Sequence, residues 1–172
     1  MSIGAASIVS ENTFRSIAPP LWLLALTVSG VNIGMALLAP AIPMLRDDLS
    51  ASGDEAQLVL SAFLVMLGLG QLVAGSLSDT LGRRPVLLSG SLLFTIAGAA
   101  ALVAPTIELL ILARAVQGFG ASACMAVGRV IINDSFDRTE AGRQLSTITM
   151  VQSIVPLMGF AGGGLIADFI GW

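Results

Sequence analysis

Residues Gly75-Ser76-Leu77-Ser78-Asp79-Thr80-Leu81-Gly82-Arg83-Arg84-Pro85 connect two apolar segments that are each long enough to cross a membrane. The stretch combines two glycines, one acid and two arginines, which predicts a tight turn between closely packed helices. Arg83 and Arg84 indicate a cytoplasmic loop, because arginine accumulates on that side of membrane proteins. Acids contribute little to topology, so we expect Asp79 at a helix end, paired with arginines.

The composition around this stretch is that of an integral membrane protein. Apolar residues make up 55% of the chain, charged residues 11%, and the mean hydropathy is +0.91; soluble domains carry about a quarter charged residues. The chain has no histidine, the usual zinc ligand and near-neutral base. Nothing in it is typical of nucleic-acid binding. We therefore expect that the protein is not an enzyme and that it binds no metal, cofactor or nucleic acid. The lipid bilayer is the expected surroundings of its helices.

Five segments have the length of about 20 residues that a spanning helix needs. We predict an all-α fold with a cytoplasmic tail over 1–18 and a transmembrane domain over 19–172, whose helices cover 21–43, 56–78, 85–104, 106–132 and 144–167. Ser52 and Glu55 fit a capping box at the start of the second helix, and Thr106 can cap the fourth.

The arginines set the expected orientation. With the N-terminus in the cytoplasm, the inner segments hold five arginines and the outer loops hold only Arg46; the five are Arg15, Arg83, Arg84, Arg138 and Arg143. Five spans then place Trp172 outside. Because helical transporters are built from repeated units, five helices predict a truncated six-helix half.

The fourth apolar segment carries a charge well inside it. It reads Ala113-Arg114-Ala115-Val116-Gln117-Gly118-Phe119-Gly120-Ala121-Ser122-Ala123. Helical spacing places Arg114, Gln117, Gly118 and Ala121 on one face. An arginine in the hydrocarbon region is costly unless it is paired or hydrated, so we expect Arg114 to face a hydrated cavity. The alternative is an arginine that locks helices together through backbone carbonyls.

These two stretches resemble signatures of the major facilitator superfamily. Residues 75–85 fill every fixed position of G-x-L-x-D-x-x-G-R-[KR]-[KRP], and the Arg114 segment is similar to R-x-x-Q-G-x-G-A-A with Ser122 in place of one alanine. The resemblance implies the N-terminal part of a transporter. It also implies that Arg114 and Gln117 line a central cavity linked to proton coupling, and that Gly75, Asp79, Gly82, Arg83 and Arg84 form a conformational-switch loop.

The fifth segment resembles the G-P-x-x-G-G motif of drug/proton antiporters in that family. Gly159, Gly163 and Gly164 occupy its glycine positions, Phe160 stands in place of the proline, and Pro156 precedes it. The resemblance implies a hinge-like contact between transporter halves that prevents leak. Close helix packing alone is the alternative.

The first segment ends in Pro40-Ala41-Ile42-Pro43, which is similar to the bicyclomycin/chloramphenicol-type drug resistance subfamily. Members often carry an acid before the prolines, where this chain has Ala36. Asn32 is the strongly polar side chain of this segment; it can bond to another helix or contact substrate. No span carries a carboxylate at mid-depth, so proton coupling needs Arg114 or an acid outside this chain.

A charge pair is expected near the cytoplasmic surface. Arg129 lies about four helical turns from Arg114, close to the expected position of Asp79. We predict that Asp79 and Arg129 pair and brace the second and fourth helices.

These features together predict a secondary transporter of a bacterial inner membrane that exports drugs or small solutes by alternating access, coupled to protons and completed by a missing C-terminal portion. Two alternatives remain open. One is a metabolite symporter or uniporter on the same fold, and the other is a truncated membrane protein that does not transport.

Overall fold

The computed structural model describes residues 21–170, except for side chains at 21–27, 33, 37, 160, 161 and 163–170. Every secondary-structure element in this range is helical: α2 (Leu21–Leu38), η1 (Ala39–Ala41), α3 (Ile42–Asp48), α4 (Gly53–Leu81), α5 (Arg83–Leu102), α6 (Ile107–Ser135) and α7 (Arg138–Ile170). The all-α prediction is confirmed. The tail over 1–18, Arg15 and Trp172 lie outside the described residues.

The first expected helix is interrupted near its end. Instead of one helix over 21–43, α2 ends at Leu38, a 3-10 turn follows, and α3 continues to Asp48. Pro40 and Pro43 each lie at the start of one of the new elements. Proline lacks a backbone N–H and its ring collides with the preceding helical turn, so each proline ends one element and begins another.

The connection between α4 and α5 is shorter than the predicted helix bounds implied, since these left residues 79–84 between the two helices. The α4 helix continues to Leu81, α5 begins at Arg83, and Gly82 alone is non-helical. Gly82 has φ +94° and ψ 157°, a conformation that residues with a Cβ rarely adopt. Its N–H donates to the Ser78 carbonyl at 3.1 Å. One glycine therefore reverses the chain.

The expected helix caps are confirmed at α4 and α6, although α4 begins at Gly53, three residues before the predicted start. The Ser52 hydroxyl accepts from the Glu55 N–H at 3.2 Å, while the Glu55 carboxylate accepts from the Ser52 N–H at 2.8 Å. The Thr106 hydroxyl accepts from the Leu109 N–H at 3.4 Å. Both caps satisfy backbone donors that have no partner within the helix.

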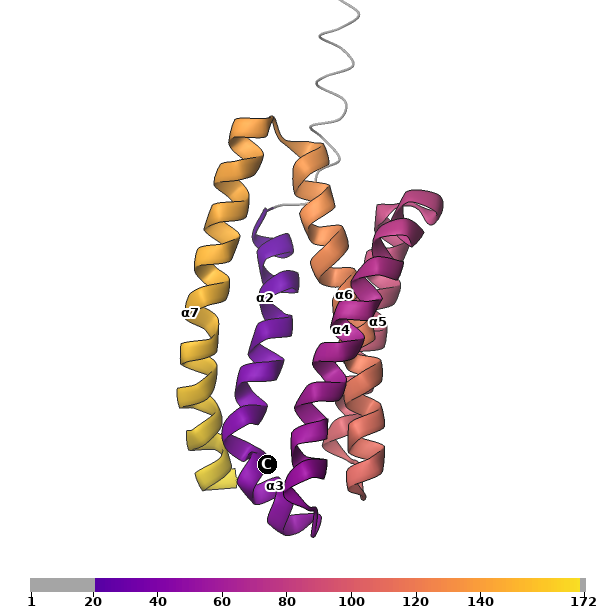
Figure 1. Ribbon diagram of the computed structural model, residues 1–172. Coiled ribbons are helices and arrows are strands. Elements are labelled where there is room, and N and C mark those ends of the chain that lie inside the picture. The colour runs from indigo at the N-terminus through magenta and orange to yellow at the C-terminus, as the bar shows by residue number, and fades with distance from the viewer. Residues whose placement is uncertain (1–20, 171–172) are drawn as a thin grey trace, which may run out of the picture.

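The helices form two groups. Figure 1 shows α6 alongside α4 and α5, whereas α2 lies between these three helices and α7. Glycines allow the close approach within the first group: a methyl group at Gly120 would lie 2.6 Å from the Phe94 nitrogen, and one at Gly70 would lie 2.8 Å from the Ser122 Cβ. Small residues are the usual contact points between membrane helices, since they let backbones come close.

Within the described residues, four segments are long and apolar enough to cross a membrane: Val28–Asp48, Gly53–Leu81, Arg83–Leu102 and Ile107–Ser135. They contain most of the first four expected spans. The fifth expected span falls within the 33-residue helix α7, and its place in a membrane stays a prediction.

Candidate functional site

The Arg114 face of α6 is turned into the helix bundle. Arg114 is 5% exposed, Gln117 6% and Ala121 0%, and Gly118 is also buried. The predicted spacing thus does place these residues on one face. That face meets α4 and α5, so the guanidinium lies inside the bundle in this conformation. A hydrated cavity around it stays a prediction.

The guanidinium contacts Gln117 and Phe63, and its buried Nε–H has no acceptor among the described residues. Its Nη1 donates to the Gln117 Oε1 at 2.7 Å, and its central carbon lies 5.9 Å from the centre of the Phe63 ring on α4. The Arg114 Nε is buried and has no hydrogen-bond partner among the described residues. The alternative prediction was that Arg114 locks helices together by donating to backbone carbonyls. No hydrogen bond from Arg114 to a backbone carbonyl is present in the described part of the chain. The buried Nε–H therefore lacks the acceptor that buried polar groups usually have.

Two glycines shape the walls around this pair. A methyl group at Gly118 would overlap the Phe63 carbonyl and would lie 3.0 Å from the Phe63 Cα, so only glycine allows α4 to sit this close. A methyl group at Gly98 on α5 would lie 2.8 Å from the Gln117 Nε2. The absence of side chains at these two positions therefore sets the positions of the Phe63 ring and the Gln117 amide.

Sequence reasoning missed Phe63. It is buried to 2% exposure and is the aromatic residue of α4. Its identity was visible in the sequence, but its contact with Arg114 depends on how α4 and α6 pack. An aromatic ring beneath a guanidinium is an attractive arrangement that strengthens when water is excluded.

Asn32 forms no hydrogen bond with Arg114 in the described part of the chain. Its Nδ2 donates to the Val28 carbonyl within α2 over a long 3.5 Å, and the side chain is half-buried. The bond to another helix is not formed among the described residues. A role in substrate contact stays a prediction.

A second polar cluster joins α4, α5 and α6 at one end of the bundle. The Arg83 guanidinium forms an ion pair with Asp79, donates from Nε to the Asp134 Oδ2 at 3.1 Å, and donates from Nη1 to the Ser78 hydroxyl at 3.3 Å. The expectation that Asp79 lies at a helix end and pairs with an arginine is confirmed. These contacts connect residues 51 positions apart in the chain.

The predicted pair between Asp79 and Arg129 is wrong. Asp79 pairs with Arg83, and Arg129 is exposed on α6. The reason is the single-residue turn at Gly82, which places Arg83 beside the last turn of α4. Asp134, one and a half turns beyond Arg129, supplies the contact from α6.

Two other residues of the loop motif, Arg84 and Gly75, lie outside this polar cluster. Arg84 is exposed, and a methyl group at Gly75 would find open space within 4 Å. In this conformation no other helix packs closely against Gly75, although close packing was expected there. The tight reversal of the chain takes place at Gly82 alone.

The glycine motif of α7 contacts α2. A methyl group at Gly159 would lie 2.5 Å from the Ala36 Cβ. Ala36 stands where the subfamily resemblance implied an acid, and this packing leaves little room for one. Pro156 lies inside α7, whereas the surroundings of Gly163 and Gly164 are not described.

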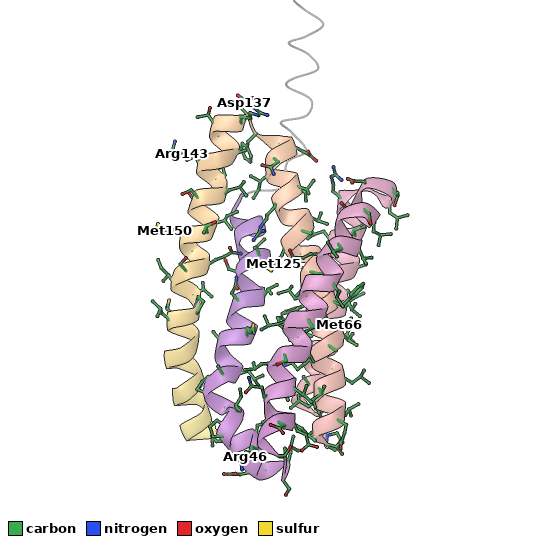
Figure 2. The ribbon with its side chains drawn as sticks, viewed as in Figure 1. Arg46, Met66, Met125, Asp137, Arg143 and Met150 are labelled. Atoms are coloured by element: carbon green, nitrogen blue, oxygen red, sulfur yellow. The ribbon has the colours of Figure 1, made fainter. Side chains whose placement is uncertain are left out.

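The two ends of the bundle differ in their charged residues. Figure 2 shows Arg46 at one end and Asp137 and Arg143 at the other. The Arg83–Asp134 pair places the α4–α5 connection at the second end. This grouping agrees with the expected sides of the loops, and which end faces the cytoplasm stays a prediction.

Comparison with known proteins identifies the family. Residues 23–172 match the model of the Major Facilitator Superfamily. The chain is 35% identical over 146 residues to a chloramphenicol resistance protein of Pseudomonas aeruginosa, covering 82% of this chain and 34% of that protein. It is 32% identical over 152 residues to multidrug resistance protein D of Escherichia coli, covering 88% and 39%. It is also 32% identical over 139 residues to multidrug resistance protein MdtL of Shewanella oneidensis, covering 81% and 35%.

The chain therefore spans about a third of the length of these relatives. The family match covers the two polar clusters and all seven described helical elements, from α2 to α7. Together with the apolar helices, it establishes that this chain is an integral membrane protein belonging to the major facilitator superfamily.

Proposed function

We propose that the chain is part of a secondary transporter that exports drugs or small solutes across a bacterial inner membrane, with its N-terminus in the cytoplasm. The similarity to relatives named for drug resistance supports this direction and this substrate class. The mechanism is alternating access, in which two halves rock around a site near the middle of the bilayer. Protons and the remaining portion of the transporter are the proposed partners.

One observation carries the proposal: the buried Arg114 has an unused N–H donor while its other contacts hold it in place. No acid among the described residues forms an ion pair with Arg114. A buried cation without an anionic neighbour is costly, which favours a role for Arg114 beyond packing. Arg114 attracts an anionic group of the substrate, or a carboxylate that releases its proton when it approaches the guanidinium. Gln117 orients the guanidinium through its 2.7 Å hydrogen bond.

The proton-carrying carboxylate of this proposal lies outside the described helix interiors. Within residues 21–159, every acid lies near a helix end or in a connection, including Glu108 in the first turn of α6 and Asp134 in the last turn. Arg114 would therefore respond to a carboxylate from another part of the transporter.

A metabolite symporter or uniporter on the same fold is the second candidate. It is favoured by Ala36, which replaces the acid of related drug exporters and packs against Gly159. Substrate efflux measured with and without a proton gradient separates the two, because only the proposed antiporter loses export when the gradient is collapsed.

Replacing Arg114 tests the site. In the full-length protein, Arg114→Ala should abolish transport while abundance in the membrane is kept, since the change makes α6 more apolar. Arg114→Lys keeps the charge without the planar guanidinium and should restore transport only in part. Arg129→Ala is the matched control, because it removes an exposed arginine from the same helix. Full activity of Arg114→Ala, or a loss of activity equal to the loss of protein, would contradict the proposal.

A further inference from the structure

Two buried polar groups outside the Arg114 site have no partner. The Ser29 hydroxyl on α2 and the Gln152 Nε2 on α7 are both buried and form no hydrogen bond among the described residues. Ser29 is only 4% exposed. Buried polar groups in proteins are almost always hydrogen-bonded, so each of these requires an explanation.

Helix geometry turns the two groups toward the same seam. Figure 1 shows α2 and α7 running in the same direction from the end at which the α6–α7 turn lies. The two helices are in close contact at Ala36 and Gly159. Ser29 and Gln152 each precede these residues by seven positions, which is about two helical turns. They therefore lie on the facing sides of the two helices, at the same level.

Apolar residues lie close to the two polar groups. Val28 on α2 and Ile148 on α7 belong to one buried cluster, 1% and 5% exposed. Ala36 and Gly159 close the seam two turns away. The unpaired groups thus lie among apolar residues of the bundle.

The available donors define what fits there. The Gln152 amide offers N–H donors, and the Ser29 hydroxyl can donate or accept, so the missing partner is an acceptor oxygen. Neither α2 nor residues 144–159 of α7 contain an ionisable side chain. A charged group would have no counter-charge on this seam, so the chemistry favours a neutral ligand.

We propose that Ser29 and Gln152 form a subsite that binds a carbonyl, hydroxyl or nitro oxygen of a neutral substrate. This proposal rests on the proposed transport function and adds a neutral, hydrogen-bonding contact that is separate from the charge of Arg114. It predicts that substrates with acceptor oxygens depend on these two residues and that substrates without them do not.

Two probes test the subsite in the full-length purified protein. Chloramphenicol is neutral and carries amide, hydroxyl and nitro oxygens, whereas ethidium is an aromatic cation without oxygen. Ser29→Ala and Gln152→Leu should each weaken chloramphenicol binding about tenfold, the effect of one lost hydrogen bond, and leave ethidium binding within about twofold. Ser153→Ala is the control, since its hydroxyl is exposed and donates to the Thr149 carbonyl at 2.9 Å; it should change neither.

The outcomes separate the subsite from the proposed function. Equal loss of both probes, no loss of chloramphenicol, or no chloramphenicol binding by the wild type would overturn the subsite, even where ethidium export supports the transporter. A clear fall in ligand-free thermal stability of both variants would also overturn it, because it would show that a structural water or another part of the chain already pairs with these groups. Selective loss of chloramphenicol binding without export of either probe would support the subsite and contradict the transport function.

Discussion

Replacing Gly118 by alanine should separate α4 from α6 at the point where Phe63 lies against Arg114. The added methyl group would overlap the Phe63 carbonyl and lie 3.0 Å from both the carbonyl carbon and the Cα of that residue. These are backbone atoms of a helix and cannot rotate away. The two helices must therefore move apart, and the Phe63 ring must move with its backbone.

The magnitude follows from comparison with a glycine that has free space. Gly68→Ala on α4 adds the same methyl group where nothing lies within 4 Å. Alanine is favoured over glycine in a helix interior by about 0.5–1 kcal/mol, and this gain is common to both variants. Overpacking a tight contact costs about 1–3 kcal/mol. Gly118→Ala should therefore be less stable than Gly68→Ala by about 1–3 kcal/mol.

Thermal unfolding of the purified full-length protein in detergent measures this difference. One kcal/mol corresponds to roughly 2–4 °C for 150–250 residues and to less for a longer chain, so Gly118→Ala should unfold a few degrees below Gly68→Ala. Transport should fall further than the loss of folded protein explains, because Arg114 loses the ring beneath it. Equal midpoints for the two variants would refute the close contact between α4 and α6.

Three further predictions concern the connections. Gly82→Ala should destabilise the protein by about 1–3 kcal/mol, because alanine is strained at φ +94°; an unchanged unfolding midpoint would contradict this. Asp79→Asn should impair transport at normal membrane abundance, because it removes the ion pair with Arg83, and normal transport would remove Asp79 from the mechanism. Reporter fusions at Ser52 and Arg138 should report the periplasm and the cytoplasm respectively, and the opposite pattern would overturn the proposed orientation.

Local sequence features were sufficient for the class of the protein and for several helix starts. Hydropathy and segment length indicate spanning helices without reference to any partner, and four of the expected spans correspond to apolar helices in the structure. The caps at Ser52 and Thr106 involve residues three positions apart, so their spacing alone predicts them. The predicted helix over 21–43 was too long, because Pro40 and Pro43 interrupt it after Leu38.

The partners of the polar side chains depended on tertiary packing. Arg83 contacts Asp134, which lies 51 residues away in the chain. The sequence predicted instead that Asp79 pairs with Arg129, because hydropathy and spacing do not show which charged residue of α6 reaches the α4–α5 connection. Helical spacing placed Arg114 and Gln117 on one face, but Phe63 contacts that face only because Gly118 lets α4 come close. Ser29 and Gln152 are ordinary polar residues in the sequence, and only the folded structure shows that the Ser29 hydroxyl and the Gln152 Nε2 are buried without a partner among the described residues. Periodicity determines which side of a helix a residue occupies, whereas packing between helices distant in sequence determines what that side meets.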